Sequence, residues 1–173
     1  IGSGATAMTI VPAMAKDVEH ITMLQRSPTY VVSFPDRDVI ANALRRFLPE
    51  MLAYRITRLK NVLMQRRLYQ RTRVAPERIK KFLLRRVRKA LGDEYTDEHF
   101  TPRYDPWDQR MCLVPNGDMF EAIEQGRASV VTDTIETFTE TGIRLASGVE
   151  LEADVVVTAT GLKLQFLSDL AIE

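Results

Sequence analysis

The opening ten residues, IGSGATAMTI, constrain the fold most strongly, because they place two glycines and a small residue at a fixed spacing. Gly2, Gly4 and Ala7 fit a turn that joins a β-strand to a helix and cradles a phosphate group. Such a turn needs a strand before it, but only Ile1 precedes the first glycine. We therefore expect that strand to lie upstream, in a longer protein of which this chain is a fragment.

Each position of this motif has a physical task. The first glycine allows the tight turn, the second lets the backbone approach a pyrophosphate, and the third small residue lets helix and strand pack closely. The helix predicted over residues 5–15, interrupted by Pro12, offers unpaired N–H groups to the phosphates. An ordinary Gly-x-Gly loop is the alternative. The candidate cofactor-binding residues are Gly2, Ser3, Gly4, Ala5, Thr6 and Ala7.

A second signal lies at the end of the next predicted strand, residues 20–25, which runs into QRSP. A site for NAD usually carries an acidic residue here, about 20 residues after the glycines, to bind the ribose 2′-hydroxyl. This chain has Arg26 and Ser27 instead. An arginine can fork onto a 2′-phosphate, which an acid would repel. The pattern favours NADP over NAD or FAD, and the alternative is an ordinary surface arginine.

Charge divides the chain into two parts. Residues 37–90 hold 17 lysines and arginines against 3 acidic residues, whereas the rest holds 7 basic and 20 acidic residues. Three helices are predicted in the basic block, over residues 38–48, from Pro49 onward and over 75–92. We expect a solvated helical insertion, while a nucleic-acid surface and a membrane-surface helix pair stay open as alternatives.

Apolar residues in these helices recur at helical spacing. Leu52, Ile56, Leu59 and Leu63 form one stripe of the second helix. The residues expected to face inward from the third helix are Ile79, Phe82, Leu83, Val87 and Leu91.

The remaining sequence predicts an α/β fold. Residues 93–118 look irregular, and a short helix (119–126), a strand (128–133) and an antiparallel meander follow. The apolar run at 154–161 reads as a buried parallel strand in the same sheet as the strand at Ile21. With 45% apolar residues the chain can build a core. The single Cys112 and two histidines exclude an internal disulfide and a metal cluster, which favours the reducing cytoplasm.

Several stretches resemble one family from end to end of the chain. They are IGSGATA, ITMLQRSPTYV, LPEMLAYR, HFTPRYDPWDQRMCLVPNGD, FTETGIRLASGVELEAD and VVVTATGL. In these the chain resembles the NADP-binding domain of FAD-containing, NADPH-dependent Baeyer–Villiger-type monooxygenases, within the subgroup that includes the ethionamide-activating enzyme. The resemblance implies a Rossmann-like NADP-binding domain that lacks its first strand and carries a basic helical insertion.

The same resemblance implies the domain limits. Residues 1–36 would be the first βα unit, 37–92 the basic helical insertion, 93–161 the remainder with the meander, and 162–173 a return segment toward an absent FAD domain. Thr160 and Gly161 would lie close to the flavin nucleotide.

The implied reaction uses both NADP(H) and FAD. NADPH reduces the flavin, O2 adds to give a peroxyflavin, and that species oxygenates a lipophilic ketone or thioether. Arg110 is the nearest match to an arginine that stabilises the peroxyflavin anion; its alternative is an ion pair with Asp105 or Asp108. The fragment alone is expected to be inactive. No nucleic-acid partner is expected, peripheral membrane contact stays open, and a stand-alone NADP-binding regulatory domain is a further alternative.

Overall fold

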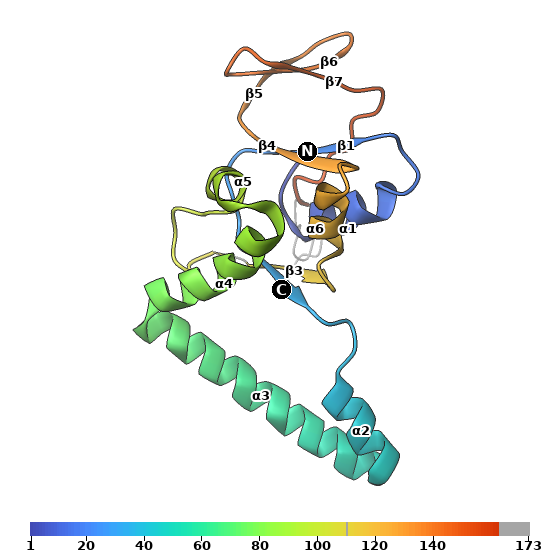
Figure 1. The fold of residues 1–173 in the computed structure, drawn as a ribbon, viewed down its shortest axis with the longest axis vertical. Coiled ribbons are helices and arrows are strands. Elements are labelled where there is room, and N and C mark those ends of the chain that lie inside the picture. Colours follow the sequence, from blue (N-terminus) through green and yellow to red (C-terminus); the bar gives the residue numbers. More distant parts are fainter. Residues whose placement is uncertain (110, 163–173) are drawn as a thin grey trace, which may run out of the picture.

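The computed structural model describes residues 1–109 and 111–162, which form a layered body and a long helical projection (Figure 1). The helices are α1 (Ala5–Met14), α2 (Val39–Phe47), α3 (Glu50–Val74), α4 (Pro76–Leu91), α5 (Asp93–His99) and α6 (Asp118–Glu124). The strands are β1 (Ile21–Gln25), β2 (Val31–Phe34), β3 (Cys112–Pro115), β4 (Ala128–Thr132), β5 (Ile135–Phe138), β6 (Gly142–Leu145) and β7 (Glu150–Glu152).

The strands form three small sheets in the described part of the chain. β1 pairs in parallel with β4, β2 pairs in parallel with β3, and β5, β6 and β7 form an antiparallel meander. This confirms the predicted α/β class and the meander. Residues 154–161, predicted as a buried strand in the same sheet as β1, are not a strand of any sheet among the described residues, and Val155 is 75% exposed instead of buried.

Ile1 lies between β1 and this extended segment. Its N–H donates to the carbonyl of Val157 at 2.7 Å, and its carbonyl accepts from the N–H of Ala159 at 2.8 Å. Bonding to residues on either side of one position is the pattern of parallel strands. On the other side, the N–H of Gly2 donates to the carbonyl of Leu24 at 2.8 Å. The opening residues therefore lie between the two segments and hydrogen-bond to both through their backbone.

Behind Ile1 this position continues as a groove of about 680 Å³. One wall is residues 21–24 of β1 and the other is residues 153–157. Since backbone groups alternate sides along a strand, Thr22 and Leu24 direct theirs into the groove, away from β4. The edge of β1 that faces the groove therefore pairs with no other strand of the described residues.

The main core lies where α1, α4, α5 and α6 pack on the two parallel sheets. Met8 and Val11 of α1, Met23 of β1 and Val130 of β4 are almost completely buried there. Helices α1, α4 and α6 cover the sheets because each places small and apolar side chains on one face. This packing fixes the start of α1 against the ends of β1 and β4.

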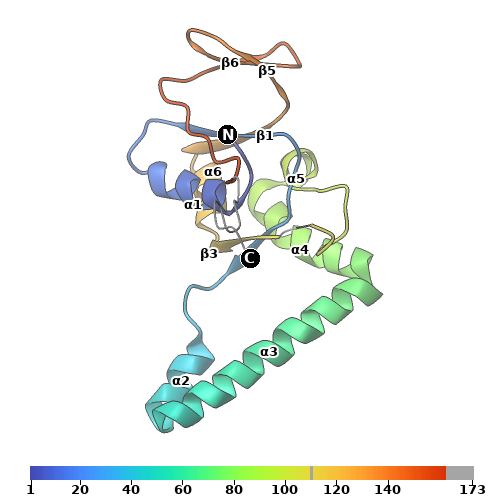
Figure 2. The same ribbon diagram turned by 180° about the vertical axis from the view of Figure 1, so that it is seen from behind.

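Helices α2 and α3, called the arm below, project from this body (Figures 1 and 2). Of the 25 residues of α3, only Ala53 and Thr72 are buried. Asp38 joins the two helices, because its carboxylate caps α2 at the N–H of Ala41 and pairs with Lys60 of α3. If the chain bound nucleic acid or a membrane surface, the two alternatives given above, this exposed basic surface would make the contact.

Some side-chain predictions for the basic helices are wrong. The α3 stripe of Leu52, Ile56, Leu59 and Leu63 is 40–60% exposed, although α3 contacts α2 and α4. In α4, Leu83 and Val87 are buried as predicted, but Phe82 is 64% exposed and Leu84 is buried in its place. The buried face of α4 is the one that contacts β2 and α6, and it differs from the face that the apolar spacing alone predicted.

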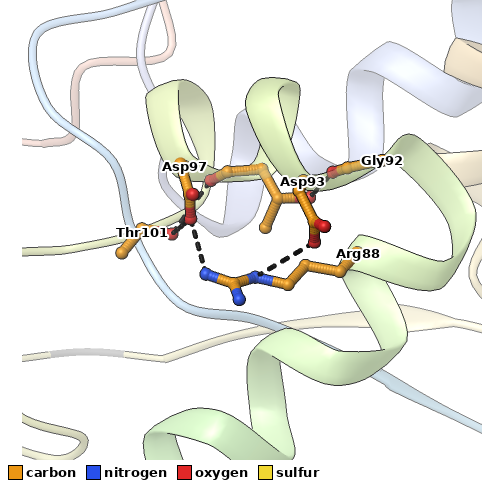
Figure 3. A network of polar contacts seen from close by, with 6 residues as sticks. Arg88, Gly92, Asp93, Asp97 and Thr101 are labelled. Carbon is orange, nitrogen blue, oxygen red and sulfur yellow. Dashed lines mark hydrogen bonds and ion pairs between the residues drawn. The ribbon is translucent and has the colours of Figure 1, made fainter.

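An exposed charge network fixes the junction of α4 and α5 (Figure 3). Arg88 lies 2.6 Å from the carboxylate of Asp97 and 3.8 Å from that of Asp93. Thr101 also donates to Asp97, at 3.4 Å. Exposed pairs of this kind contribute about 0.2–1 kcal/mol each. The network therefore contributes little to the stability of the fold, and its main effect is to orient α5.

Candidate functional site

A pocket of about 620 Å³ opens where the first turn of α1 meets the ends of β1 and β4. Nine of the ten candidate cofactor-binding residues line it: Gly2, Ser3, Gly4, Ala5, Thr6, Arg26, Ser27, Thr160 and Gly161. The tenth, Ala7, is 4% exposed and lies in the core beneath the turn. Segments up to 159 residues apart in the sequence therefore meet at one surface.

The glycine turn brings bare backbone to this pocket. Gly2 has φ of +117°, and a Cβ built on it would lie 2.5 Å from the carbonyl oxygen of Ala159. A side chain at this position would fill the contact between the opening turn and residues 159–161. Gly4 precedes α1 and has no side chain to cap it, so first-turn N–H groups face the pocket. A helix N-terminus of this kind attracts anions.

Arg26 and Ser27 stand at the rim, directly after β1, and both are exposed. The buried residue before them is fixed in place. The side-chain amide of Gln25 donates to the carbonyl of His99 at 2.7 Å and to the hydroxyl of Thr132 at 2.9 Å. The strand end is therefore rigid while the guanidinium of Arg26 is free to meet an anion from solvent.

The other side of the pocket comes from residues that the sequence did not indicate. Tyr104 and Gln109 line it from one loop, and Asp133, Thr134 and Ile135 line it after β4. Hydrogen bonds from Ser147 and from the backbone N–H of Thr134 lower the pKa of Asp133. Asp133, Thr134 and Ile135 had one sequence signal, their place at or just after the end of a predicted strand, whereas Tyr104 and Gln109 had none.

Tyr104 is anchored from two directions. Its hydroxyl lies 3.0 Å from that of Thr29, and its carbonyl accepts a 2.8 Å hydrogen bond from the hydroxyl of Tyr30. Burial, with the negative charge of Asp105 second, raises the pKa of Tyr30 to about 12. Tyr30 therefore keeps its proton and donates throughout the physiological range.

Residues around the predicted catalytic position have structural contacts. Arg110, the predicted catalytic residue, lies outside the described residues. Asp108 pairs with Arg73 at 2.7 Å. Cys112 is buried beneath the opening turn, with its Sγ 3.5 Å from the carbonyl of Ser3. Trp107 does not line the pocket and stacks edge-on with Tyr69.

His99 connects α5 to β4 below the pocket. Its Nδ1 lies 2.8 Å from the hydroxyl of Thr132, and its ring meets that of Tyr95 edge-on at 4.5 Å. Burial lowers the pKa of His99, and the charge of Glu98 opposes this effect in part.

Acid is therefore expected to destabilise the chain through His99. Below the ordinary pKa of about 6.5, the unfolded chain binds a proton that the folded chain resists, so the free energy of unfolding falls. The loss is at most about 1.4 kcal/mol per pH unit. Urea unfolding between pH 7.5 and 5.5 measures it, and H99N should flatten the profile. Equal pH slopes for the two proteins would contradict this role.

Within the described residues, no cluster of three or more histidine, cysteine, aspartate or glutamate side chains could hold a metal ion. The helices of residues 1–109 and 111–162 include none that is both long and apolar enough to cross a membrane.

The sequence is similar to FAD-containing and FAD-binding monooxygenases over almost the whole chain. The chain is 58% identical over 167 residues to the FAD-containing monooxygenase EthA of Mycobacterium tuberculosis. It is 53% identical over 171 residues to the probable FAD-binding monooxygenase AlmA of Acinetobacter baylyi. These matches cover 95% and 98% of the chain but 34% of each relative, so the chain spans about a third of their length. No protein-family model matches the chain.

Solved structures share the fold at much lower sequence identity. A crystal structure of OTEMO in complex with FAD and NADP matches 94% of the chain and 37% of its own length, with a TM-score of 0.66 and 18% identity. An open crystal structure of cyclohexanone monooxygenase matches 92% of the chain and 39% of its own length, with a TM-score of 0.61 and 20% identity. These similarities concern the fold alone.

Proposed function

We propose that this chain, which belongs to the family of FAD-containing monooxygenases, is the NADPH-binding part of such a flavoprotein. One observation carries the proposal. The 620 Å³ pocket gathers the glycine turn, the start of α1 and Arg26 with Ser27, at the spacing that a dinucleotide requires. The OTEMO structure with FAD and NADP, which shares the fold, supports it.

In this proposal each group meets one part of NADP(H). The bare backbone of Gly2 and Gly4 allows the pyrophosphate to approach, and the N–H groups of Ala5 and Thr6 at the start of α1 donate to it. Arg26 forks onto the 2′-phosphate. When bound, NADPH supplies a hydride, which in the whole flavoprotein passes to FAD before oxygen is used.

Ser27 and the segment at Thr160 complete the binding surface. The hydroxyl of Ser27 adds a hydrogen bond beside Arg26, and Thr160 and Gly161 close the pocket toward the flavin nucleotide. Both segments are exposed and lie on the lining of the pocket, which supports these roles.

We also infer the domain arrangement. Residues 21–24 of β1 line one wall of the groove and residues 153–157 the other, and Ile1 hydrogen-bonds to Val157 and Ala159 through its terminal ammonium and its carbonyl. A strand leading into Ile1 would join β1 and residues 155–159 into one Rossmann-like sheet. The return segment at 162–173 would lead to a FAD domain, in a protein as long as the curated relatives.

The proposed activity is oxygenation of a lipophilic ketone or thioether with NADPH and O2. A chimera tests it, in which this chain replaces the matching third of the relative that is 58% identical. We expect a yellow protein that consumes oxygen with NADPH and these substrates, while the chain alone does neither. A chimera that retains flavin but no longer oxidises NADPH would contradict the proposal, since its flavin content shows that it has folded.

A further inference from the structure

A strained loop separates the arm from the nucleotide pocket. Residues 103–109 leave the buried Pro102 and run between the end of α3 and the segment that follows β1. Tyr104 and Gln109 of this loop line the pocket. The loop therefore forms one wall of the pocket, and its conformation decides where that wall stands.

The pocket side of the loop is tied to residues close to Arg26. The hydroxyl of Tyr104 lies 3.0 Å from that of Thr29, three positions after Arg26. The buried Tyr30 donates to the carbonyl of Tyr104 at 2.8 Å, and the two rings meet edge-on at 5.5 Å. Movement of the loop would therefore reach the rim where Arg26 stands.

The opposite side of the loop is tied to α3. Nη1 of Arg73 lies 2.7 Å from Oδ1 of Asp108, and the ring of Tyr69 meets that of Trp107 edge-on at 6.2 Å. Tyr69 and Arg73 are four residues apart, so they lie on one face of the helix. Two neighbouring side chains of the arm thus contact two neighbouring residues of the loop.

Trp107 has a backbone conformation that needs such support. Its φ is +72°, in the left-handed region that a bulky side chain rarely adopts. Such conformations persist only where surrounding contacts enforce them, and they concentrate at functional sites. Trp107 is 44% exposed, so burial alone does not enforce it. Within the loop, the N–H of Asp108 donates to the carbonyl of Asp105 at 3.0 Å and closes the turn. From outside the loop, the contact with Tyr69 and the ion pair of Asp108 hold it against α3.

We propose that Tyr69 and Arg73 of α3 are positioning residues for NADP(H). Through Trp107 and Asp108 they hold the loop so that Tyr104 and Gln109 face the nucleotide. Neither residue touches the pocket itself, and the proposal rests on the function proposed above. It gives the end of the arm a task in nucleotide binding that is separate from the charge of its surface.

The test is a titration of the 173-residue chain with NADP⁺. A Y69A/R73A variant is expected to bind about tenfold more weakly, the size of effect typical of indirect coupling. The conservative Y69F/R73K variant should bind like the wild type, because it keeps the ring and the positive charge. Trp107 is the only tryptophan in the sequence, so acrylamide quenching of its fluorescence reports on the loop directly.

The same helix offers a matched control. Tyr54 and Arg58 form another tyrosine–arginine pair four residues apart, with a 2.9 Å hydrogen bond, on an exposed part of α3. Y54A/R58A should change neither NADP⁺ affinity nor Trp107 quenching, although it removes the same groups from the same helix. An equal loss of affinity in both double variants would reduce the effect to helix stability and overturn the proposal.

The remaining outcomes are also decisive. If Y69A/R73A binds NADP⁺ like the wild type, the positioning role is wrong, whatever the quenching shows. If the wild type does not bind NADP⁺, the proposed nucleotide function fails and this inference fails with it. In that case, acrylamide quenching of Trp107 that rises only in Y69A/R73A would still show that Tyr69 and Arg73 hold the loop. The error would then lie in the ligand assigned to the pocket.

Discussion

Alanine in place of Gly2 is expected to abolish measurable NADP⁺ binding and to destabilise the chain by about 3 kcal/mol or more. The φ of +117° suits glycine, and the added Cβ would lie 2.5 Å from the carbonyl oxygen of Ala159. That oxygen belongs to the backbone, so relief requires the opening turn to move away from residues 159–161. Both sides of the pocket would then be displaced.

Gly148 provides the matched control for this change. It also has positive φ, at +87°, but none of the described atoms lies within 4 Å of a Cβ built there. G148A should therefore cost only the backbone strain, about 1–2 kcal/mol, and leave NADP⁺ binding intact. Calorimetric titration and thermal unfolding of both variants make the measurement. Normal NADP⁺ affinity in G2A would show that the turn is not the phosphate site.

Removing the guanidinium of Arg26 is expected to weaken NADP⁺ binding by about 10–100-fold while NAD⁺ binding changes by less than about threefold. The reason is that charge-assisted hydrogen bonds to the 2′-phosphate are lost, and NAD⁺ has no phosphate there. Arg26 is exposed and its side chain is not part of the core, so R26A should fold normally. Fluorescence or calorimetric titration with both nucleotides measures the change in preference.

An exposed arginine outside the pocket controls for general charge. R37A removes one positive charge from the loop before α2, where it does not line the pocket. It should change NADP⁺ affinity only slightly, through long-range attraction that salt screens. Equal losses of affinity in R26A and R37A would mean that Arg26 acts through net charge and not through a specific contact.

The sequence predicted those elements whose signals are local. The 3.6-residue spacing in α1, the proline before α3 and the turns at Gly142 and Gly148 each act within a few residues. Strand β1 was also predicted at its observed place, because its core-facing apolar residues cluster. Elements of this kind can be predicted because the residues that determine them lie within the element or next to it.

Elements that depend on distant partners could not be predicted in this way. Strand β2 lies between two prolines, a pattern typical of a loop, but it pairs with β3, about 80 residues later. Helix α5, DEYTDEH, has no apolar period and is held by tertiary contacts, including the 2.7 Å bond from the N–H of Val130 to the hydroxyl of Tyr95. Residues 154–161 have a strand-like sequence, but a strand also needs a neighbour along its length.

The residues of the candidate site also fall into two groups, those that local sequence signals predicted and those that depend on distant partners. Spacing alone indicated the glycine turn and the rim at Arg26, since both belong to one βα unit. Tyr104 and Gln109 reach the pocket only because Tyr30 and the end of α3 hold their loop in place. No periodicity or motif links residue 69 or 73 to residue 107, so this wall became visible only in three dimensions.

The most direct test of the account is the affinity of the unmodified chain for NADP⁺ and for NAD⁺, measured by calorimetry at one salt concentration. The pocket geometry and Arg26 predict that NADP⁺ binds at least about tenfold more tightly than NAD⁺. Equal affinities, or no binding of either nucleotide to a chain that unfolds cooperatively, would contradict the assignment of this pocket to NADP(H).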